Sequence, residues 1–220
     1  MAGVTRLDPA RVAENAARVR EELAAAARRA GRDPADVQLL TAVKYVGLDD
    51  IGVLAGAGLT LLGENRAQQL AAKAEAWPDA GLRWHFIGQL QSRKVKQILP
   101  FVELIHSVAS DSALAQLERH GTPETEILVE VDVAGEEGKA GIPPAELAGF
   151  LDRAPVRVTG LMGMPPFAED PEASRPHFAA LRELAREHGL RELSMGTSQD
   201  YAVAVEEGAT IVRVGSVLFD

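Results

Sequence analysis

The chain has 220 residues, which suits one large domain or two small ones, and α/β barrels often fill about 200 to 250 residues as a single domain. It contains no cysteine, so disulfides, thiolate catalysis and cysteine-based zinc or iron–sulfur sites are excluded. The formal net charge of -9 argues against a nucleic-acid partner, because such a protein must neutralise backbone phosphates with Lys and Arg. A small anionic ligand remains compatible with this charge.

The first predicted element is a helix over residues 9–30, where an apolar stripe of helical spacing ends before Gly31. The segment lacks the apolar core of a signal peptide, and its acidic residues are not typical of a transit peptide. No apolar run in the chain is long enough to span a bilayer. We therefore expect a cytoplasmic protein with no membrane contact.

The rest of the chain alternates between short apolar runs and helical or polar segments. The apolar runs, which are the strand candidates, cover residues 37–43, 59–63, 84–87, 102–106, 126–133, 156–162, 192–195 and 210–214. The helix candidates cover residues 48–57, 64–76, 91–99, 111–120, 144–151, 174–188 and 199–206. This β-then-α order predicts parallel strands in a (β/α)8 TIM barrel, with a doubly wound open sheet as the alternative. No linker divides the chain, so residues 1–220 are expected to form a single domain, with the first helix as an addition to the barrel.

In such a barrel the active site lies at the carboxyl ends of the strands. The stretch VQLLTAVKYVG, residues 37–47, places Lys44 at that end of the first strand. A neutral lysine amine is a nucleophile toward carbonyl groups, and partly apolar surroundings favour the neutral form. The alternative is a strand-end lysine whose aliphatic stem packs while its ammonium group reaches water.

A second group of residues follows the seventh and eighth strands. Ser198 precedes a helical segment and is expected to be its N-cap, so that its hydroxyl and the first free backbone N–H groups form an anion site. Gly215 and Ser216 offer further N–H donors and a second hydroxyl. Phosphate sites recur at this place in barrels. Ordinary helix capping and turn formation require the same residues. The alternative that these residues serve only the fold therefore stays open.

Arg213 shares the strand face of Ile211 and Gly215 in the stretch TIVRVGS. A buried guanidinium needs a partner, which could be a structural ion pair or a ligand acceptor such as a pyridine nitrogen. A lysine, a phosphate site and a ring-facing arginine are together the parts that pyridoxal 5′-phosphate (PLP) requires. Because Arg donates and does not accept a proton, the ring nitrogen would stay unprotonated and the cofactor would be a weak electron sink.

The five histidines do not show the close spacing of metal ligands, so no metal site is expected. His85 and His106 stand at strand ends. They could touch a ligand, but the interpretation we favour for each is a hydrogen-bonded core histidine.

Motifs in a fixed order cover nearly the whole chain: AVKY, GENRAQQ, WHFIGQLQSRK, IHSV, VDVAGEEGKAG, GLMGMPP and LSMGTSQDYAVAVEEGATIVRVGSVLF. With these motifs the chain resembles the YggS/PROSC family of pyridoxal phosphate-binding, or PLP homeostasis, proteins. The resemblance implies one barrel similar to the N-terminal domain of alanine racemase. It implies that Lys44 carries PLP as a Schiff base and that Arg213 faces the pyridine nitrogen. The other cofactor-binding residues that it implies are Asn65, Ser194, Ser198, Gly215 and Ser216. The chain departs from the common pattern at Gln69, Thr197 and Asp220, which affects local loop contacts.

The resemblance also implies a function: to hold PLP reversibly and to buffer it or supply it, with apo-PLP enzymes as partners. A monomer is expected. The alternative is a low-activity PLP-dependent amino-acid racemase or lyase. Racemisation needs acids or bases on both faces of the substrate carbon, and alanine racemases place one of them on a second domain for which this chain has no residues. Neither Tyr45 nor Tyr201 has an obvious claim to that role, so no catalytic residue is assigned.

Overall fold

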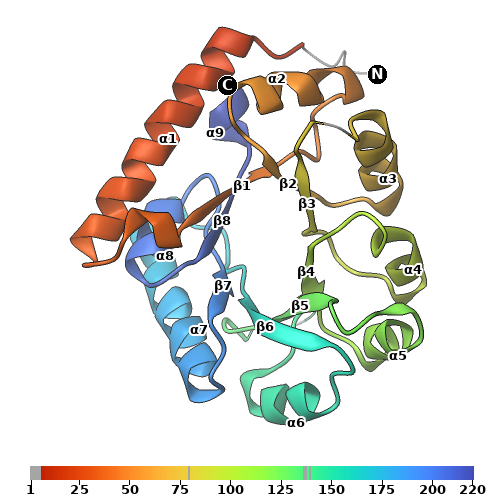
Figure 1. Ribbon diagram of the computed structural model, residues 1–220. Helices are drawn as coiled ribbons and strands as arrows, with labels where there is room; N and C mark the ends of the chain where they lie inside the picture. The colour runs from red at the N-terminus through yellow and green to blue at the C-terminus, as the bar shows by residue number, and fades with distance from the viewer. Residues whose placement is uncertain (1–5, 79, 136–137, 139) are drawn as a thin grey trace.

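The computed structural model describes residues 6–78, 80–135, 138 and 140–220. Parallel strands form a closed barrel in which each strand pairs with the next in sequence and β1 pairs with β8 (Figure 1). The strands are β1 (Gln38–Ala42), β2 (Leu61–Glu64), β3 (Arg83–Phe86), β4 (Leu104–Val108), β5 (Glu126–Glu130), β6 (Arg157–Met162), β7 (Glu192–Ser194) and β8 (Ile211–Val214). Each lies within or beside a predicted apolar run. The TIM barrel is thereby confirmed, and the open sheet is ruled out.

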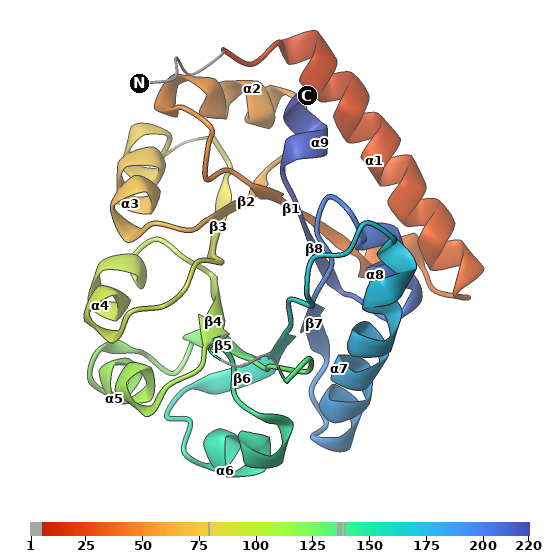
Figure 2. The same ribbon diagram turned by 180° about the vertical axis from the view of Figure 1, so that it is seen from behind.

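Helices surround the barrel and alternate with the strands (Figures 1 and 2). They are α2 (Ile51–Gly56), α3 (Ala67–Ala76), α4 (Val95–Ile98), α5 (Asp111–His120), α6 (Leu147–Asp152), α7 (Arg175–Glu187), α8 (Tyr201–Glu206) and α9 (Ser216–Phe219). Short 3-10 turns lead into four of them, at Leu48–Asp50, Ser92–Lys94, Pro144–Glu146 and Pro171–Ser174; another, Pro34–Asp36, precedes β1. The sequence did not predict α9.

The additional helix α1 (Pro9–Arg29) is confirmed. Asp8 caps it by accepting the backbone N–H groups of Ala10 and Arg11, and Gly31 follows its end with a φ of 69°. The helix lies outside the β/α ring and packs against α8, α9 and α2 (Figure 1). Among the described residues, no helix is both long enough and apolar enough to cross a membrane.

Strand alternation separates two apolar cores. The larger core fills the layer between the strands and the helices. The smaller core lies inside the barrel and consists of Leu40, Leu61, Leu104, Leu128, Met162 and Ile211. Because Arg213 is two residues from Ile211 on β8, its side chain enters the barrel, as the strand pattern predicts.

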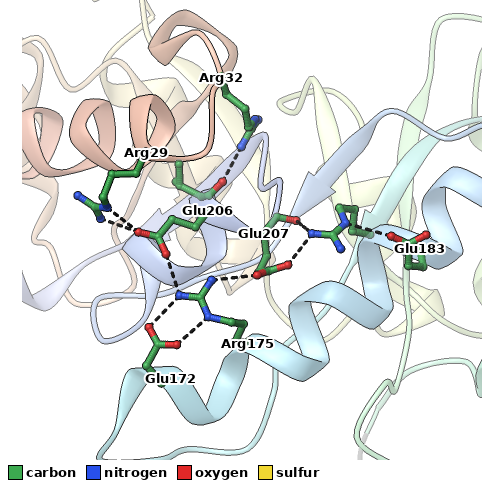
Figure 3. A network of polar contacts seen from close by, with 9 residues as sticks. Arg29, Arg32, Glu172, Arg175, Glu183, Glu206 and Glu207 are labelled. Atoms are coloured by element: carbon green, nitrogen blue, oxygen red, sulfur yellow. Dashed lines mark hydrogen bonds and ion pairs between the residues drawn. The ribbon is translucent and has the colours of Figure 1, made fainter.

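Charged side chains connect α1 to α7 and α8 on the outside of the barrel (Figure 3). Arg175 bonds Glu172, Glu206 and Glu207, and Arg29 bonds Glu206. The network therefore fastens the additional helix to the last β/α units of the barrel.

Candidate functional site

Lys44 lies in a turn directly beyond the carboxyl end of β1. The preceding Val43 is buried, whereas Lys44 is exposed. Its Nζ lies 5.0 Å from the centre of the ring of Tyr45, which is also exposed. The amine is thus at the end of the barrel where this fold places active sites, and it is open to a ligand.

A buried ion pair holds the backbone beside two of the predicted site residues. Nζ of Lys73, in α3, lies 2.6 Å from Glu64 Oε2 and donates to the Val43 carbonyl oxygen at 2.8 Å. Oε1 of Glu64 accepts the backbone N–H of Asn65 at 2.7 Å and that of the next residue at 3.1 Å. Since Val43 precedes Lys44, the pair connects the ends of β1 and β2. Sequence reasoning missed it because Lys73 reads as one more charge on a helix.

Asn65 begins the loop after β2, and its buried Oδ1 has no hydrogen-bond partner among the described residues. The loop packs tightly against Gly88, where an added Cβ would lie 2.1 Å from the Asn65 carbonyl oxygen. Ser107 Oγ in turn donates to the Gly88 carbonyl. An unpaired buried acceptor in a fixed loop is compatible with contact to a donor of a ligand.

Arg213 is buried and is satisfied by neutral acceptors. Its Nη1 donates to the carbonyl oxygen and to Oγ of Ser194, both at 2.6 Å, and its Nη2 donates to the Gly163 carbonyl oxygen at 3.0 Å. None of the described carboxylates forms an ion pair with Arg213. A structural ion pair is therefore not the partner of this buried guanidinium among the described residues. Its Nε–H and the second Nη2 hydrogen have no acceptor among the described residues, which leaves them available to a ligand.

The charge of Arg213 stands in a low-dielectric interior. Burial lowers the pKa of its guanidinium to about 10, an effect that Glu130 and Asp200 oppose, so Arg213 stays charged at neutral pH. Burial raises the pKa of Glu130, at the end of β5, although Arg213 opposes that shift. Glu130 was not among the predicted site residues; a charged residue ending a buried run was the signal that could have found it.

The predicted phosphate segments lie together, with one correction. Gly215 N–H donates to Ser198 Oγ at 3.1 Å, which joins the segments after β7 and β8. Ser198 is not a helix N-cap, because α8 begins at Tyr201 and Asp200 stands at the cap position. The Asp200 carboxylate accepts the backbone N–H of Thr197 at 2.7 Å and bends residues 198–200 into a turn. Ser216 begins α9 and is exposed.

His85 and His106 are hydrogen-bonded core side chains, as expected, but they lie within β3 and β4 and not at the strand ends. His85 Nδ1 and His106 Nε2 lie 2.9 Å apart, and His106 Nδ1 lies 2.8 Å from Ser194 Oγ. No group of three or more His, Asp or Glu side chains in the described part of the chain could hold a metal ion. Of the motif VDVAGEEGKAG, residues 136, 137 and 139 lie outside the described residues.

Comparisons with known proteins identify the family. The pyridoxal phosphate homeostasis protein of Aquifex aeolicus is 42% identical over 219 residues, covering 94% of this chain and 96% of that protein. The protein of the same name from Pseudomonas aeruginosa is 37% identical over 217 residues, covering 94% of each chain. This chain belongs to the pyridoxal phosphate homeostasis protein family. A scan against family models found no match.

Solved structures agree with this membership. PipY of Synechococcus elongatus, solved with PLP bound, superposes with a TM-score of 0.80 at 32% identity, covering 95% of this chain and 100% of that chain. Alanine racemase from Corynebacterium glutamicum superposes with a TM-score of 0.69 at 16% identity, covering 97% of this chain but 61% of the racemase. The second likeness shows a shared fold: the PLP homeostasis barrel is an alanine racemase-like barrel.

Proposed function

We propose that this PLP homeostasis protein binds PLP at the carboxyl ends of its barrel strands, with Lys44 as the point of covalent attachment, and buffers or supplies the cofactor. The observation that carries the proposal is the presence, at this one end of the barrel, of an exposed lysine amine and a buried arginine with unused N–H groups. The PLP-bound structure of PipY supports it, because the match extends over nearly the full length of both chains.

Each predicted residue has a role in this proposal. Lys44 offers its amine to the aldehyde, and Arg213 offers an N–H group to the ring nitrogen. Asn65 offers an acceptor that now lacks a donor. The phosphate group would meet the segments joined by the bond between Gly215 and Ser198. The remaining predicted contacts come from Ser194 and Ser216.

The bound cofactor supplies an electrophilic aldehyde and an electron-withdrawing ring. Arg213 weakens that withdrawal, because a guanidinium donates a hydrogen bond and does not give up its proton at neutral pH. Tyr201 is not placed to act as an acid or base at this site: its hydroxyl donates to Glu22 of α1, outside the barrel. Both points favour a carrier of PLP over an efficient racemase.

Borohydride trapping tests the attachment. The protein is incubated with PLP, reduced and digested, and the added phosphopyridoxyl mass is located by mass spectrometry. We expect the label on Lys44 and its loss in Lys44→Ala, with Lys94→Ala as the matched control that keeps it. Lys73 should stay unlabelled because it is 2% exposed and ion-paired. Label spread over surface lysines in both variants would remove the basis of the proposal.

Exchange of the α-hydrogen of amino acids with solvent distinguishes the carrier from the rival function, a low-activity amino-acid racemase or lyase. The PLP-loaded protein is incubated with L-amino acids in deuterium oxide, and deuterium at the α-carbon is measured. A carrier should give far less than the 1 to 1000 turnovers per second that are roughly typical of enzymes. Exchange at an enzymatic rate would favour the rival.

The partners also belong to this proposal: apo-PLP enzymes as acceptors, with the carrier acting as a cytoplasmic monomer. Reactivation of an apo-enzyme should be faster with the loaded protein than with an equal concentration of free PLP. Equal rates would mean that the protein only buffers the cofactor.

A further inference from the structure

Four polar side chains form a continuous hydrogen-bonded chain across the inside of the barrel. Nη1 of Arg213 on β8 lies 2.6 Å from Oγ of Ser194 on β7. That Oγ lies 2.8 Å from His106 Nδ1 on β4, and His106 Nε2 lies 2.9 Å from His85 Nδ1 on β3. All four side chains are buried, His106 and Ser194 completely. The chain thus reaches from the arginine at the proposed cofactor site to the opposite side of the barrel.

The far end of the chain opens into a cavity of about 310 Å³ at the amino-terminal ends of the strands. His85 lines this cavity together with Arg83 and Glu103, which are bonded to each other. His85 Nε2 faces the Glu103 carboxylate at 4.0 Å. The chain therefore begins at a cation and ends beside an anion.

This arrangement fixes the donor-to-acceptor order of the hydrogen bonds that link the four side chains. Arginine can only donate, so Ser194 Oγ accepts from Arg213, and its own hydrogen is free to go to His106 Nδ1. His106 then carries its hydrogen on Nε2 and donates it to His85 Nδ1, and His85 carries its hydrogen on Nε2, toward Glu103. The reverse order would point the lone pair of His85 at a carboxylate.

Both imidazoles are held in the neutral form that such a chain needs. Burial lowers the pKa of His85 to about 3, and Arg83 adds to the effect. Burial also lowers the pKa of His106 well below its usual value, with His85 and Arg213 adding to it. A protonated imidazole would donate from both nitrogens and break the sequence of donors and acceptors.

We propose that His106 and His85 are positioning residues for the cofactor site: they orient the Ser194 hydroxyl so that it accepts from Arg213, which fixes the guanidinium with its remaining N–H groups toward the ligand. The inference rests on the proposed function, since the ligand in question is the ring of PLP. It assigns a role to two side chains that are not themselves proposed to contact the cofactor.

The first test needs no cofactor. The intact protein is labelled with 15N-histidine, and the ring nitrogen shifts of His85 and His106 are assigned by comparison with His85→Gln and His106→Asn. We expect both rings as the Nε2–H tautomer. An Nδ1–H tautomer at either ring would overturn the proposed direction, whether or not the protein binds PLP.

The second test measures PLP itself. His106→Phe should weaken PLP binding about tenfold and shift the absorption spectrum of the bound cofactor, because one bond that orients a charged group is lost. His177→Phe, in α7, is the matched control and should change neither. Wild-type affinity and an unchanged spectrum in His106→Phe would overturn the proposal.

Ser194→Ala covers the case in which His106→Phe does not fold. It removes the hydroxyl link but leaves Arg213 its bonds to the carbonyl oxygens of Ser194 and Gly163. We expect the same spectral shift, with recovery in Ser194→Thr, which retains a hydroxyl. If the spectrum did not recover in Ser194→Thr, that result would count against the hydrogen-bonded chain of side chains. If wild-type protein failed to bind PLP at all, the proposed function would be wrong. The tautomers of His85 and His106 would still decide whether the hydrogen-bonded chain from Arg213 to His85 exists.

Discussion

Two buried cations inside this protein are stabilised in different ways. Lys73 has a full anionic partner in Glu64, whereas Arg213 has neutral oxygen atoms from Ser194 and Gly163. An ion pair neutralises a charge within the protein, but neutral acceptors leave most of it unneutralised. The field of Arg213 is therefore available to a ligand, while Lys73 acts within the scaffold.

Lys73→Met should lower the free energy of unfolding by about 3–5 kcal/mol, because it leaves the Glu64 carboxylate buried without its cation. The measurement is urea unfolding. Lys73→Met combined with Glu64→Gln should lose less than the single variant, since no buried charge remains unpaired. A single variant as stable as the wild type would show that the ion pair does not hold the ends of β1 and β2.

The buried histidines should make stability depend on pH. His85 faces His106, Arg83 and Glu103, and His106 faces His85, Ser194 and Arg213. Their lowered pKa values mean that, below an unfolded-state pKa of about 6.5, the unfolded chain binds protons that the folded chain does not. The free energy of unfolding should therefore fall as the pH decreases from about 6.5 to 4, by up to about 1.4 kcal/mol per pH unit for each histidine.

Urea unfolding at several pH values measures this slope. His106→Asn should have a shallower slope than the wild type, and His177→Asn should have the wild-type slope. Equal slopes in all three proteins would mean that His106 is protonated in the folded chain over this range.

At the scale of elements, the loops after β2 and β3 are joined by a contact that admits no side chain. A Cβ at Gly88 would meet three backbone atoms of Asn65 within 2.7 Å. Backbone atoms cannot turn away as the end of a flexible side chain can. This contact fixes the start of the loop that carries Asn65.

Gly88→Ala should cost about 1–3 kcal/mol of folding free energy by overpacking, and it should also weaken PLP binding by displacing Asn65. Gly56→Ala is the matched control. Its added Cβ would meet nothing within 4 Å, so it should be neutral or slightly stabilising in α2. Equal stability of the two variants would contradict the close packing of Gly88 against Asn65.

For the whole molecule, apolar packing should outweigh surface charge in fastening α1 to the barrel. Leu23 lies on the buried face of α1, whereas the Arg175 network lies on the outside of the barrel, where water and salt screen it (Figure 3). Leu23→Ala should lower the free energy of unfolding by about 2–5 kcal/mol. Arg175→Met should have a clearly smaller effect that shrinks further in high salt; a larger effect than that of Leu23→Ala would reverse this order.

Much of this architecture could be predicted because its signals are local. Apolar runs and helical spacing mark the β/α units, and strand alternation places Arg213 inside the barrel next to Ile211. Lys44 could be placed at the rim for the same reason. At the site the predicted start of α3 at residue 64 was wrong, because the helix begins at Ala67, and so was the predicted start of α8. There the Asp200 carboxylate turns the chain before the helix begins, and Ser198 resembles a cap equally well in either case.

The sequence by itself thus determined the barrel, the position of Lys44 and the strand face of Arg213, since each follows from residues a few positions apart. The tertiary structure alone decided which side chains meet across the barrel. The Lys73–Glu64 pair, the bond between Gly215 and Ser198, and the chain from Arg213 to His85 join residues on different strands and helices. The Lys73–Glu64 pair forms when α3 packs against β2. The other contacts form only after the strands close in register, because closure sets which residues of different strands share one level of the barrel.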